Sequence, residues 1–204
     1  AAASGAGVVT PDSSVVVPPT YQGGSHTVHD AEGHGGEHLT FAGVLAKSSN
    51  IGTVMVAQKV GAQKLYDAMS RFGYGEKTGL GLPGESRGLL PKPADWSGTS
   101  IATIPIGQGV STNVMQIASV YATVANGGVR VTPMIVRSVA DASGVQVTVK
   151  PPAPRRVISA KVAAQLTSIR EAGVGEDSTA PLAAGPGYRT AGQTGTSERA
   201  GDGR

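Results

Sequence analysis

Hydrophobic residues between positions 39 and 72 recur at helical spacing. Residues 39–60 follow this spacing except at the polar residues 47–50, which predicts two short helices that meet at this break. Residues 62–72 place their apolar side chains on one face and are followed by Gly73, which predicts a third helix that ends at this glycine. Residues 8–28 have an extended pattern interrupted by prolines, so we expect loops and short edge strands there.

The rest of the chain predicts a long loop, two more helices and several strands. Residues 73–106 are irregular, and a helix over 114–124 follows, with Ser111 or Thr112 as its N-terminal cap. The β-branched runs 134–139 and 145–149 predict a hairpin. Ser159 is expected to cap a further helix, and residues 187–190 lead into a strand over 191–196. Helices followed by strands, without β-α-β alternation, favour an α+β fold.

The composition indicates a folded chain that forms one domain or part of a larger one. Glycine and proline occupy about one position in five of the 204, which predicts many turns but not disorder. The absence of cysteine excludes disulfides, thiol catalysis and thiolate metal sites. The net charge of +3 is small and its sources are scattered, so nucleic acid is not an expected partner. No apolar run approaches the roughly 18 residues of a membrane span.

Four histidines lie between residues 26 and 38, together with several acidic residues. A zinc site is one interpretation, because His34 and His38 are one helical turn apart and imidazole is a good zinc ligand. The three glycines among residues 33–36 make a regular helix unfavourable there, so the spacing fixes no ligand geometry. The pattern therefore favours a glycine-rich surface loop, and no metal is expected.

Several short motifs are each typical of ordinary turns and caps when taken alone. Ser-Ser-Asn at 48–50 is a common helix cap, Gly-Gln-Gly at 107–109 a common turn, and Thr-Gly-Thr at 194–196 an ordinary strand end. Their joint order carries more information. In chain order the sequence holds Ser-Ser-Asn (48–50), Phe-Gly-Tyr-Gly (72–75), Thr-Gly-Leu-Gly-Leu-Pro-Gly-Glu (78–85), Ile-Gly-Gln-Gly (106–109), Asn-Gly-Gly (126–128) and Gly-Tyr-Arg-Thr-Ala-Gly-Gln-Thr-Gly-Thr (187–196).

This succession resembles the transpeptidase domain of class B penicillin-binding proteins, the D,D-transpeptidases that cross-link peptidoglycan. The pair His29-Asp30 lies where such proteins often carry the same two residues. The resemblance implies a penicillin-binding-protein/serine β-lactamase-like transpeptidase fold of the α+β class, with an antiparallel sheet flanked by helices. We expect residues 1–204 to form a partial transpeptidase domain, incomplete at both ends, because the chain starts like a helix tail and stops in a turn-like stretch.

The active site of this family has three signatures, which are Ser-x-x-Lys, Ser-x-Asn and Lys-Thr-Gly. The resemblance places the second signature at Ser48 and Asn50. It places the third at Gln193, Thr194 and Gly195. None of the seven lysines has a serine three positions before it. We therefore expect the acylated serine and the catalytic lysine to lie upstream of residue 1.

The resemblance implies a catalytic role for two residues of the first half of the chain. Ser48 would relay protons through its hydroxyl, between the lysine of the first signature and residue 193. Asn50 would offer its side-chain amide to the substrate backbone and fix the peptide for attack. Attack on a peptide carbonyl also needs donors for the developing oxyanion, and these are expected from the last strand.

The strand over 191–196 would bind the substrate. Thr194 and Thr196 would meet the C-terminal carboxylate of the stem peptide, or the carboxylate that β-lactams carry in its place. The substrate would pair along the strand edge, where Gly195 leaves room for its backbone. The Thr196 N–H would be one oxyanion donor.

Gln193 departs from the family pattern, which has lysine at this position. Glutamine keeps the hydrogen-bonding capacity but loses the charge and cannot act as a general acid. We expect the activity to fall on the order of 100-fold or more as a result. A tuned enzyme, an inactive paralogue and a local sequence error are three explanations that the chain alone leaves open.

The parent protein is accordingly expected to cross-link the bacterial cell wall. It would form an acyl-enzyme with D-Ala-D-Ala stem peptides, bind β-lactams and need no cofactor. It would act on the outer side of the cytoplasmic membrane, anchored by a segment outside this chain, with divisome or elongasome proteins as further partners. The 204-residue chain, without a nucleophile, is expected neither to turn over substrate nor to react with penicillin.

Two alternatives follow from the same motifs. Gln193 favours a non-catalytic binding or scaffold module of the cell-wall machinery, which would keep the groove without the chemistry. A β-lactamase or β-lactam sensor on the same fold would share the Ser-x-Asn and Lys-Thr-Gly regions. The Leu-Pro-Gly-Glu at 82–85 and the Gly-Gln-Gly at 107–109 are not expected in those families.

Overall fold

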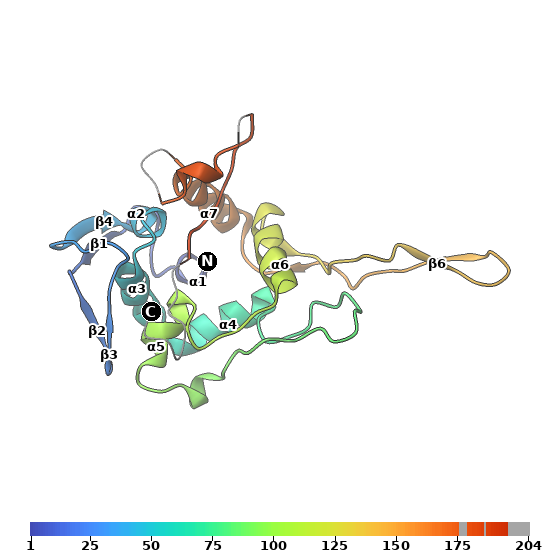
Figure 1. The fold of residues 1–204 in the computed structure, drawn as a ribbon, viewed down its shortest axis with the longest axis horizontal. Coiled ribbons are helices and arrows are strands. Elements are labelled where there is room, and N and C mark those ends of the chain that lie inside the picture. The colour runs from blue at the N-terminus through green and yellow to red at the C-terminus, as the bar shows by residue number, and fades with distance from the viewer. Residues whose placement is uncertain (176–178, 186, 196–204) are drawn as a thin grey trace.

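The computed structural model describes residues 1–175, 179–185 and 187–195 of the chain. Its elements gather in two packed groups (Figure 1). The first group surrounds helix α3 (Asn50–Val60), and the second contains α6 (Val114–Ala125) and α7 (Ala160–Ala172). Helix α4 (Ala62–Phe72) contacts both α3 and α6, so it joins the two groups.

The described strands pair in four separate antiparallel sheets of two strands each. In one half of the chain β1 (Ser14–Val17) pairs with β4 (Glu37–Thr40), and β2 (Tyr21–Gly23) pairs with β3 (His26–Val28). In the other half β5 (Val129–Arg130) pairs with β8 (Arg155–Arg156), and β6 (Ser138–Ala140) pairs with β7 (Gln146–Thr148). Antiparallel strands together with packed helices confirm the predicted α+β class.

The remaining helical elements are short. They are α1 (Ala2–Gly5), α2 (Phe41–Ala46), α5 (Ser100–Thr103), and the 3-10 turns η1 (Pro93–Asp95), η2 (Ile104–Ile106) and η3 (Pro181–Ala183). Helices α2 and α3 meet at the polar break, as the hydrophobic pattern predicts. In the described part of the chain, no helix is long and apolar enough to span a membrane.

The helix boundaries agree with the local sequence signals in most places. Helix α4 ends at Gly73, whose φ of 99° is the left-handed conformation typical of a C-terminal glycine. Ser159 caps α7 by accepting a hydrogen bond from the Val162 N–H at 3.2 Å. The predicted cap of α6 is wrong, since Asn113 takes this place instead of Ser111 or Thr112.

Asn113 caps α6 because it forms a reciprocal pair with Gln116. The Asn113 side chain accepts a hydrogen bond from the Gln116 N–H at 2.8 Å, and the Gln116 side chain accepts one from the Asn113 N–H at 2.7 Å. This capping box satisfies two N–H groups that a helix start otherwise leaves without partners. With Ser111 or Thr112 as the cap, Asn113 and Gln116 would not form this reciprocal pair of hydrogen bonds.

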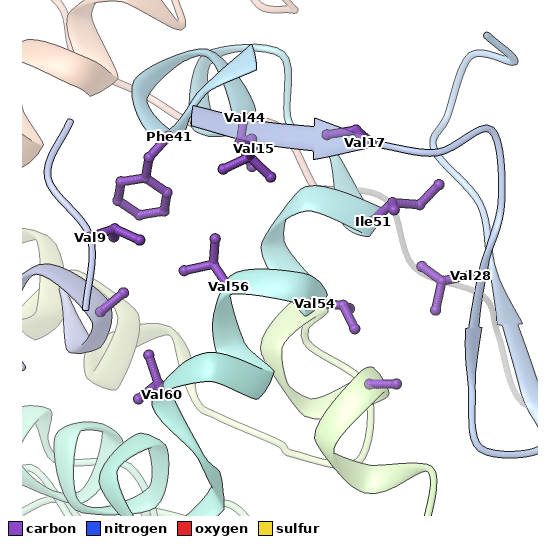
Figure 2. Packing of buried hydrophobic residues seen from close by; sticks show 12 residues of the cluster. Val9, Val15, Val17, Val28, Phe41, Val44, Ile51, Val54, Val56 and Val60 are labelled. Carbon is purple, nitrogen blue, oxygen red and sulfur yellow. The ribbon is translucent and has the colours of Figure 1, made fainter. Parts of the chain in front are cut away.

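The larger core lies around α3 (Figure 2). Val54 and Val56 of α3 are buried with valines from β1 and with Phe41 and Val44 of α2. Burial of each such side chain stabilises the fold by roughly 1.5–3 kcal/mol relative to exposure. The packing fixes α2 and α3 relative to each other, and with them the connection at residues 47–49 that carries the candidate site.

A second, smaller core joins α4, α6 and α7. Phe72, at the end of α4, packs with Ile158 and with Val162 and Leu166 of α7. Val120 and Val124 of α6 cover this cluster from one side. The cluster fixes α7 against the rest of the molecule, and the end of α7 carries the segment that leads to residue 193.

The predicted hairpin is present and projects away from the second group (Figure 1). Its strands are shorter than the β-branched runs, and Val139 lies opposite Val147. Asp141 organises the turn, because its carboxylate accepts hydrogen bonds from the backbone of Ser143 (2.9 Å) and Val145 (3.0 Å). The Ser143 hydroxyl also donates to this carboxylate and makes the largest contribution to lowering the pKa of Asp141 below its ordinary value. The backbone bonds lower it further.

Candidate active site

Ser48 lies in the tight connection between α2 and α3, and its backbone is left-handed, with φ of 58°. Helix α2 ends in a Schellman motif. The Ser49 N–H donates to the Val44 carbonyl at 2.9 Å. The Ser48 N–H donates to the Leu45 carbonyl at 3.3 Å. Ser48 thus occupies the position that glycine usually fills in this motif.

A serine in this conformation is unfavourable for the backbone. The left-handed region costs an L-residue with a β-carbon roughly 1–2 kcal/mol. Ser48 is the one non-glycine residue with positive φ in the described ranges. Strained backbone of this kind concentrates at functional sites, where the side chain is needed in a particular direction. The conformation therefore supports a functional role for the Ser48 hydroxyl.

Ser49, rather than Ser48 or Asn50, supplies the helix cap. Its buried hydroxyl accepts a hydrogen bond from the Gly52 N–H at 2.9 Å. Gly52 has no room for a side chain, because a β-carbon there would lie 2.7 Å from Val44 Cγ1. Capping thus explains only the middle residue, Ser49, of the Ser48-Ser49-Asn50 triplet. Ser48 and Asn50 are half-buried and have other contacts.

Asp30 lies against the N-terminal end of α3. Its Oδ2 accepts a hydrogen bond from the Ser49 hydroxyl at 2.8 Å, and its Oδ1 accepts one from the Ile51 N–H at 2.9 Å. A carboxylate at this place also complements the positive end of the helix dipole. The His29-Asp30 pair is visible in the sequence, but its role is not. The spacing alone could not show which side of the triplet Asp30 contacts.

Asn50 is turned toward the loop that contains this pair. Its Nδ2 donates to the His29 carbonyl at 3.0 Å. A backbone carbonyl accepts this bond, so the His29 side chain is not required for it. Residues 29 and 30 together hold the start of α3 from one side.

Gln193 reaches the triplet from the opposite end of the chain. The Gly192 N–H donates to the Arg170 carbonyl at 3.1 Å, which fastens this segment to the last turn of α7. Burial lowers the pKa of Arg170 from its ordinary value. The exposed Arg189 pairs with Glu171 at 2.7 Å and holds the same segment. These contacts bring residue 193 to the connection between α2 and α3.

The Gln193 Nε2 donates a hydrogen bond to the Ser48 Oγ at 2.6 Å. The two residues are 145 positions apart in sequence. Both are half-buried, so the bond lies at the edge of the site and not in the core. Since the amide occupies an acceptor site of the hydroxyl oxygen, the Ser48 proton is directed elsewhere.

The third signature differs from the expected strand edge. Residues 191–195 form no strand, because no described strand pairs with them. Thr194 Oγ1 donates to Thr179 Oγ1 at 2.9 Å, and Gly195 is exposed. The predicted carboxylate-binding and oxyanion residue Thr196 lies outside the described residues.

A polar cavity of about 350 Å³ lies beside the triplet. Its lining includes Asp30, Glu37, Lys47, Ser49 and Thr179. Lys47 and Glu37 form an ion pair at 2.6 Å across this region. His34 and His38 do not share one face of a helix, since His38 lies in β4.

The sequence matches the penicillin binding protein transpeptidase domain family over residues 1–204. The chain belongs to this family. Its motifs and relatives are those of the class B penicillin-binding proteins, as the resemblance implied.

Two curated relatives illustrate the match. The chain is 42% identical over 199 residues to the penicillin-binding protein PbpB of Mycobacterium tuberculosis, which covers 95% of the chain and 29% of the relative. It is 34% identical over 198 residues to the peptidoglycan D,D-transpeptidase FtsI of Escherichia coli, which covers 96% of the chain and 32% of the relative. The chain thus spans about a third of the length of these relatives.

Solved structures confirm the penicillin-binding-protein transpeptidase fold. Penicillin binding protein 3 from Mycobacterium tuberculosis, in complex with aztreonam, superposes with a TM-score of 0.93 at 41% identity. The match covers 99% of this chain and 47% of that protein. The ampicillin complex of the same protein gives a TM-score of 0.92 at 42% identity. These solved structures therefore show that protein in complex with two β-lactams.

Proposed function

We propose that this chain is part of a peptidoglycan D,D-transpeptidase and contributes two of its three active-site signatures. The observation that carries the proposal is the 2.6 Å hydrogen bond from Gln193 to Ser48. It joins the second and third signatures across 145 residues, as one shared site requires. The names of the relatives and the β-lactam complexes of the structural neighbours support the same activity.

The reaction divides between this chain and the rest of the protein. A serine of a Ser-x-x-Lys signature outside residues 1–204 attacks the D-Ala-D-Ala carbonyl, and its proton moves to the leaving amine as the peptide bond breaks. The terminal D-alanine leaves. An amine of a neighbouring stem peptide then attacks the ester, which forms the new amide and releases the serine.

Ser48 and Asn50 act in the first of these steps. The Ser48 hydroxyl accepts from Gln193 and is free to donate its own proton, so it can pass a proton between the nucleophile and the leaving amine. Asn50 orients the substrate backbone after it exchanges its bond to the His29 carbonyl for one to the peptide. No step of this scheme requires a cofactor or a metal.

Residues 194–196 bind the substrate in this proposal. Thr194 exchanges its bond to Thr179 for one to the substrate carboxylate, and Thr196 supplies a backbone donor for the oxyanion. The β-strand geometry of this segment forms when a further strand of the complete domain or the substrate itself pairs with it. Gly195 is exposed and leaves this edge open.

Labelling with a fluorescent penicillin tests the proposal. The full-length protein that contains this chain should take covalent label, and the Ser48→Ala variant should label at least about 100-fold more slowly. The isolated 204-residue chain should take none. Label on the isolated chain would contradict the assignment of the nucleophile to another segment.

A non-catalytic scaffold of the cell-wall machinery is the second candidate, and Gln193 is the observation that favours it. An uncharged residue attracts a carboxylate less than the lysine of the family pattern does. A scaffold would bind stem peptides with the groove but form no ester. Full-length protein that binds a D-Ala-D-Ala peptide but never labels would support the scaffold over the enzyme.

The setting of the protein belongs to the same proposal. Stem peptides of the cell wall are reached on the outer side of the cytoplasmic membrane of a bacterium, so the parent protein is placed there, held by a segment outside this chain. Proteins of the divisome or the elongasome are its proposed partners. Protease accessibility in intact spheroplasts checks the side of the membrane, and a domain that is protected there would contradict it.

A further inference from the structure

We propose that Asp30, supported by His34, is a positioning residue that holds Ser48 in its reactive conformation. This inference rests on the proposed role of Ser48 in acylation. The geometry that carries it is the contact of one carboxylate with Ser49 and Ile51, the two bonded residues that follow the strained Ser48 at the start of α3.

The Asp30 carboxylate accepts three hydrogen bonds from three different residues. They come from the Ser49 hydroxyl at 2.8 Å, the Ile51 N–H at 2.9 Å and the His34 ring at 3.1 Å. The side chain of Asp30 is only 11% exposed. Such charge-assisted bonds, largely shielded from water, are about twice as strong as neutral ones. They fix the carboxylate in one orientation.

The His34 ring is fixed in turn by its second nitrogen. The Gly36 N–H donates to His34 Nδ1 at 3.1 Å, so this nitrogen must act as an acceptor. The neutral ring then carries its proton on Nε2, which donates to the Asp30 Oδ2 at 3.1 Å. The loop between β3 and β4 thereby presents a preset carboxylate to the triplet. Lys47 and Glu37, which face the same cavity, are paired with each other.

The contacts of Asp30 with the α2–α3 connection lie directly after the residue that must be held. Ser48 carries the positive φ, Ser49 follows it directly, and Ile51 lies in the first turn of α3. A strained backbone persists only where the surrounding contacts over-determine it. Asp30 does not touch the substrate in this arrangement. It acts through the backbone of residues 48–51.

The Asp30→Asn substitution would keep the shape of the side chain but not its three hydrogen bonds. Its oxygen could still accept from the Ile51 N–H. Its NH₂ group would face the hydroxyl of Ser49 and the Nε2–H of His34, which are both donors in the present arrangement. The Asp30→Asn variant therefore loosens the connection without creating a cavity.

A double-mutant cycle on the full-length protein tests this inference. The measurement is the second-order rate constant of acylation by a fluorescent penicillin. Asp30→Asn should lower it by between about 10-fold and 100-fold, since small misplacement of a catalytic group has effects of this size. The same change in a Ser48→Ala background should lower it by less than about twofold, because the group that it positions is gone. Glu32→Gln, at an exposed carboxylate of the same loop, is the matched control and should leave the rate unchanged.

The outcomes separate this inference from the proposed function. Equal losses from Asp30→Asn in both backgrounds would overturn the inference and leave the role of Ser48 intact. A Ser48→Ala variant that labels normally, or a full-length protein that takes no label, would overturn the proposed function and the inference with it.

A second variant covers the case in which Asp30→Asn fails to fold. His34→Ala removes one of the three bonds to Asp30 at a residue that is 15% exposed. It should lower the acylation rate about three- to tenfold, and again only when Ser48 is present. Full activity of His34→Ala would contradict the supporting role of the imidazole.

Discussion

At the scale of single residues, the proposed function depends on the contact between Gln193 and Ser48. The amide donates to the hydroxyl at 2.6 Å, so position 193 can direct the Ser48 proton even without a charge. What the amide lacks is the electrostatic attraction of an ammonium group for the carboxylate of the substrate. Hydrogen bonding and charge are therefore separable at this position.

Replacement of Gln193 by lysine tests this separation. Gln193→Lys in the full-length protein should raise the acylation rate by roughly 100-fold, because a preorganised positive charge is added beside the carboxylate site. Rate constants for a fluorescent penicillin are the measurement. Gln63→Lys, on the exposed face of α4, adds the same charge elsewhere and should change nothing. A Gln193→Lys variant that labels no faster would show that the amide is a sufficient partner for Ser48.

The left-handed backbone of Ser48 predicts an opposition between stability and activity. Ser48→Gly should raise the stability by about 1 kcal/mol, because glycine adopts a φ of 58° without strain. The same variant should lose acylation as Ser48→Ala does. Calorimetry of both variants checks this, and Ser48→Ala should have the melting temperature of the unmodified protein. A glycine variant no more stable than the alanine variant would contradict the strain at this position.

At the scale of elements, helices α2 and α3 determine where the triplet lies. They approach closely at Gly52, whose missing side chain leaves space for Val44. Gly52→Ala should destabilise the protein by about 1–3 kcal/mol, since a β-carbon 2.7 Å from Val44 Cγ1 forces the helices apart. The acylation rate should fall with it, because the connection between the helices moves. Gly5→Ala, in α1 with no atom near the added carbon, is the control in the same melting experiment.

The loop after α4 is held by a carboxylate whose titration can be followed. Thr78 donates to the Glu85 Oε1 from its hydroxyl at 2.6 Å and from its N–H at 2.9 Å, and these bonds lower the pKa of Glu85. A carboxyl with a lowered pKa stabilises the fold above its unfolded pKa, and this contribution is lost as the pH falls through the folded value. Glu85→Gln should therefore flatten the stability curve in the acid range and leave the pH dependence above it unchanged. Melting temperatures of both proteins across acidic pH check this, and identical curves would contradict it.

At the scale of the whole molecule, one buried amide of α6 binds several backbone groups of the long irregular segment. The Gln116 Nε2 donates to the carbonyls of Glu76 (2.8 Å) and Arg87 (2.9 Å), and more weakly to that of Gly73 (3.3 Å). Its Oε1 accepts from the Asn113 N–H at 2.7 Å. The side chain is 2% exposed, so water does not replace these bonds.

Gln116→Met should destabilise the protein by about 2–4 kcal/mol, because methionine fills the space but leaves these buried backbone groups without a partner. The melting temperature of the full-length protein measures this. Gln63→Met on the exposed face of α4 should shift it by the equivalent of less than about 0.5 kcal/mol. A small shift in Gln116→Met would mean that the segment is held by other contacts.

The sequence by itself determined where the longer helices lie, the stop of α4 and the membership of the family. Hydrophobic periodicity and the glycine after α4 are local signals, and local physics decides where a helix runs and ends. The order of the short motifs identified the transpeptidase family without any knowledge of contacts. The wrong cap of α6 arose because three neighbouring residues could all serve, and only the reciprocal bond with Gln116 selects Asn113.

Only the tertiary structure decided how the triplet divides its tasks. Sequence spacing could not show that Ser49 caps α3, that Ser48 takes a glycine position, or that Asp30 bonds the start of the helix. The bonds of Asp30 to Ser49 and Ile51 cross 19 and 21 residues, and the bond of Gln193 to Ser48 crosses 145, so they depend on packing that brings distant segments together. The strand expected at 191–196, of which residues 191–195 are described, also depends on tertiary contacts. A strand requires a paired neighbour, and propensity alone does not supply one.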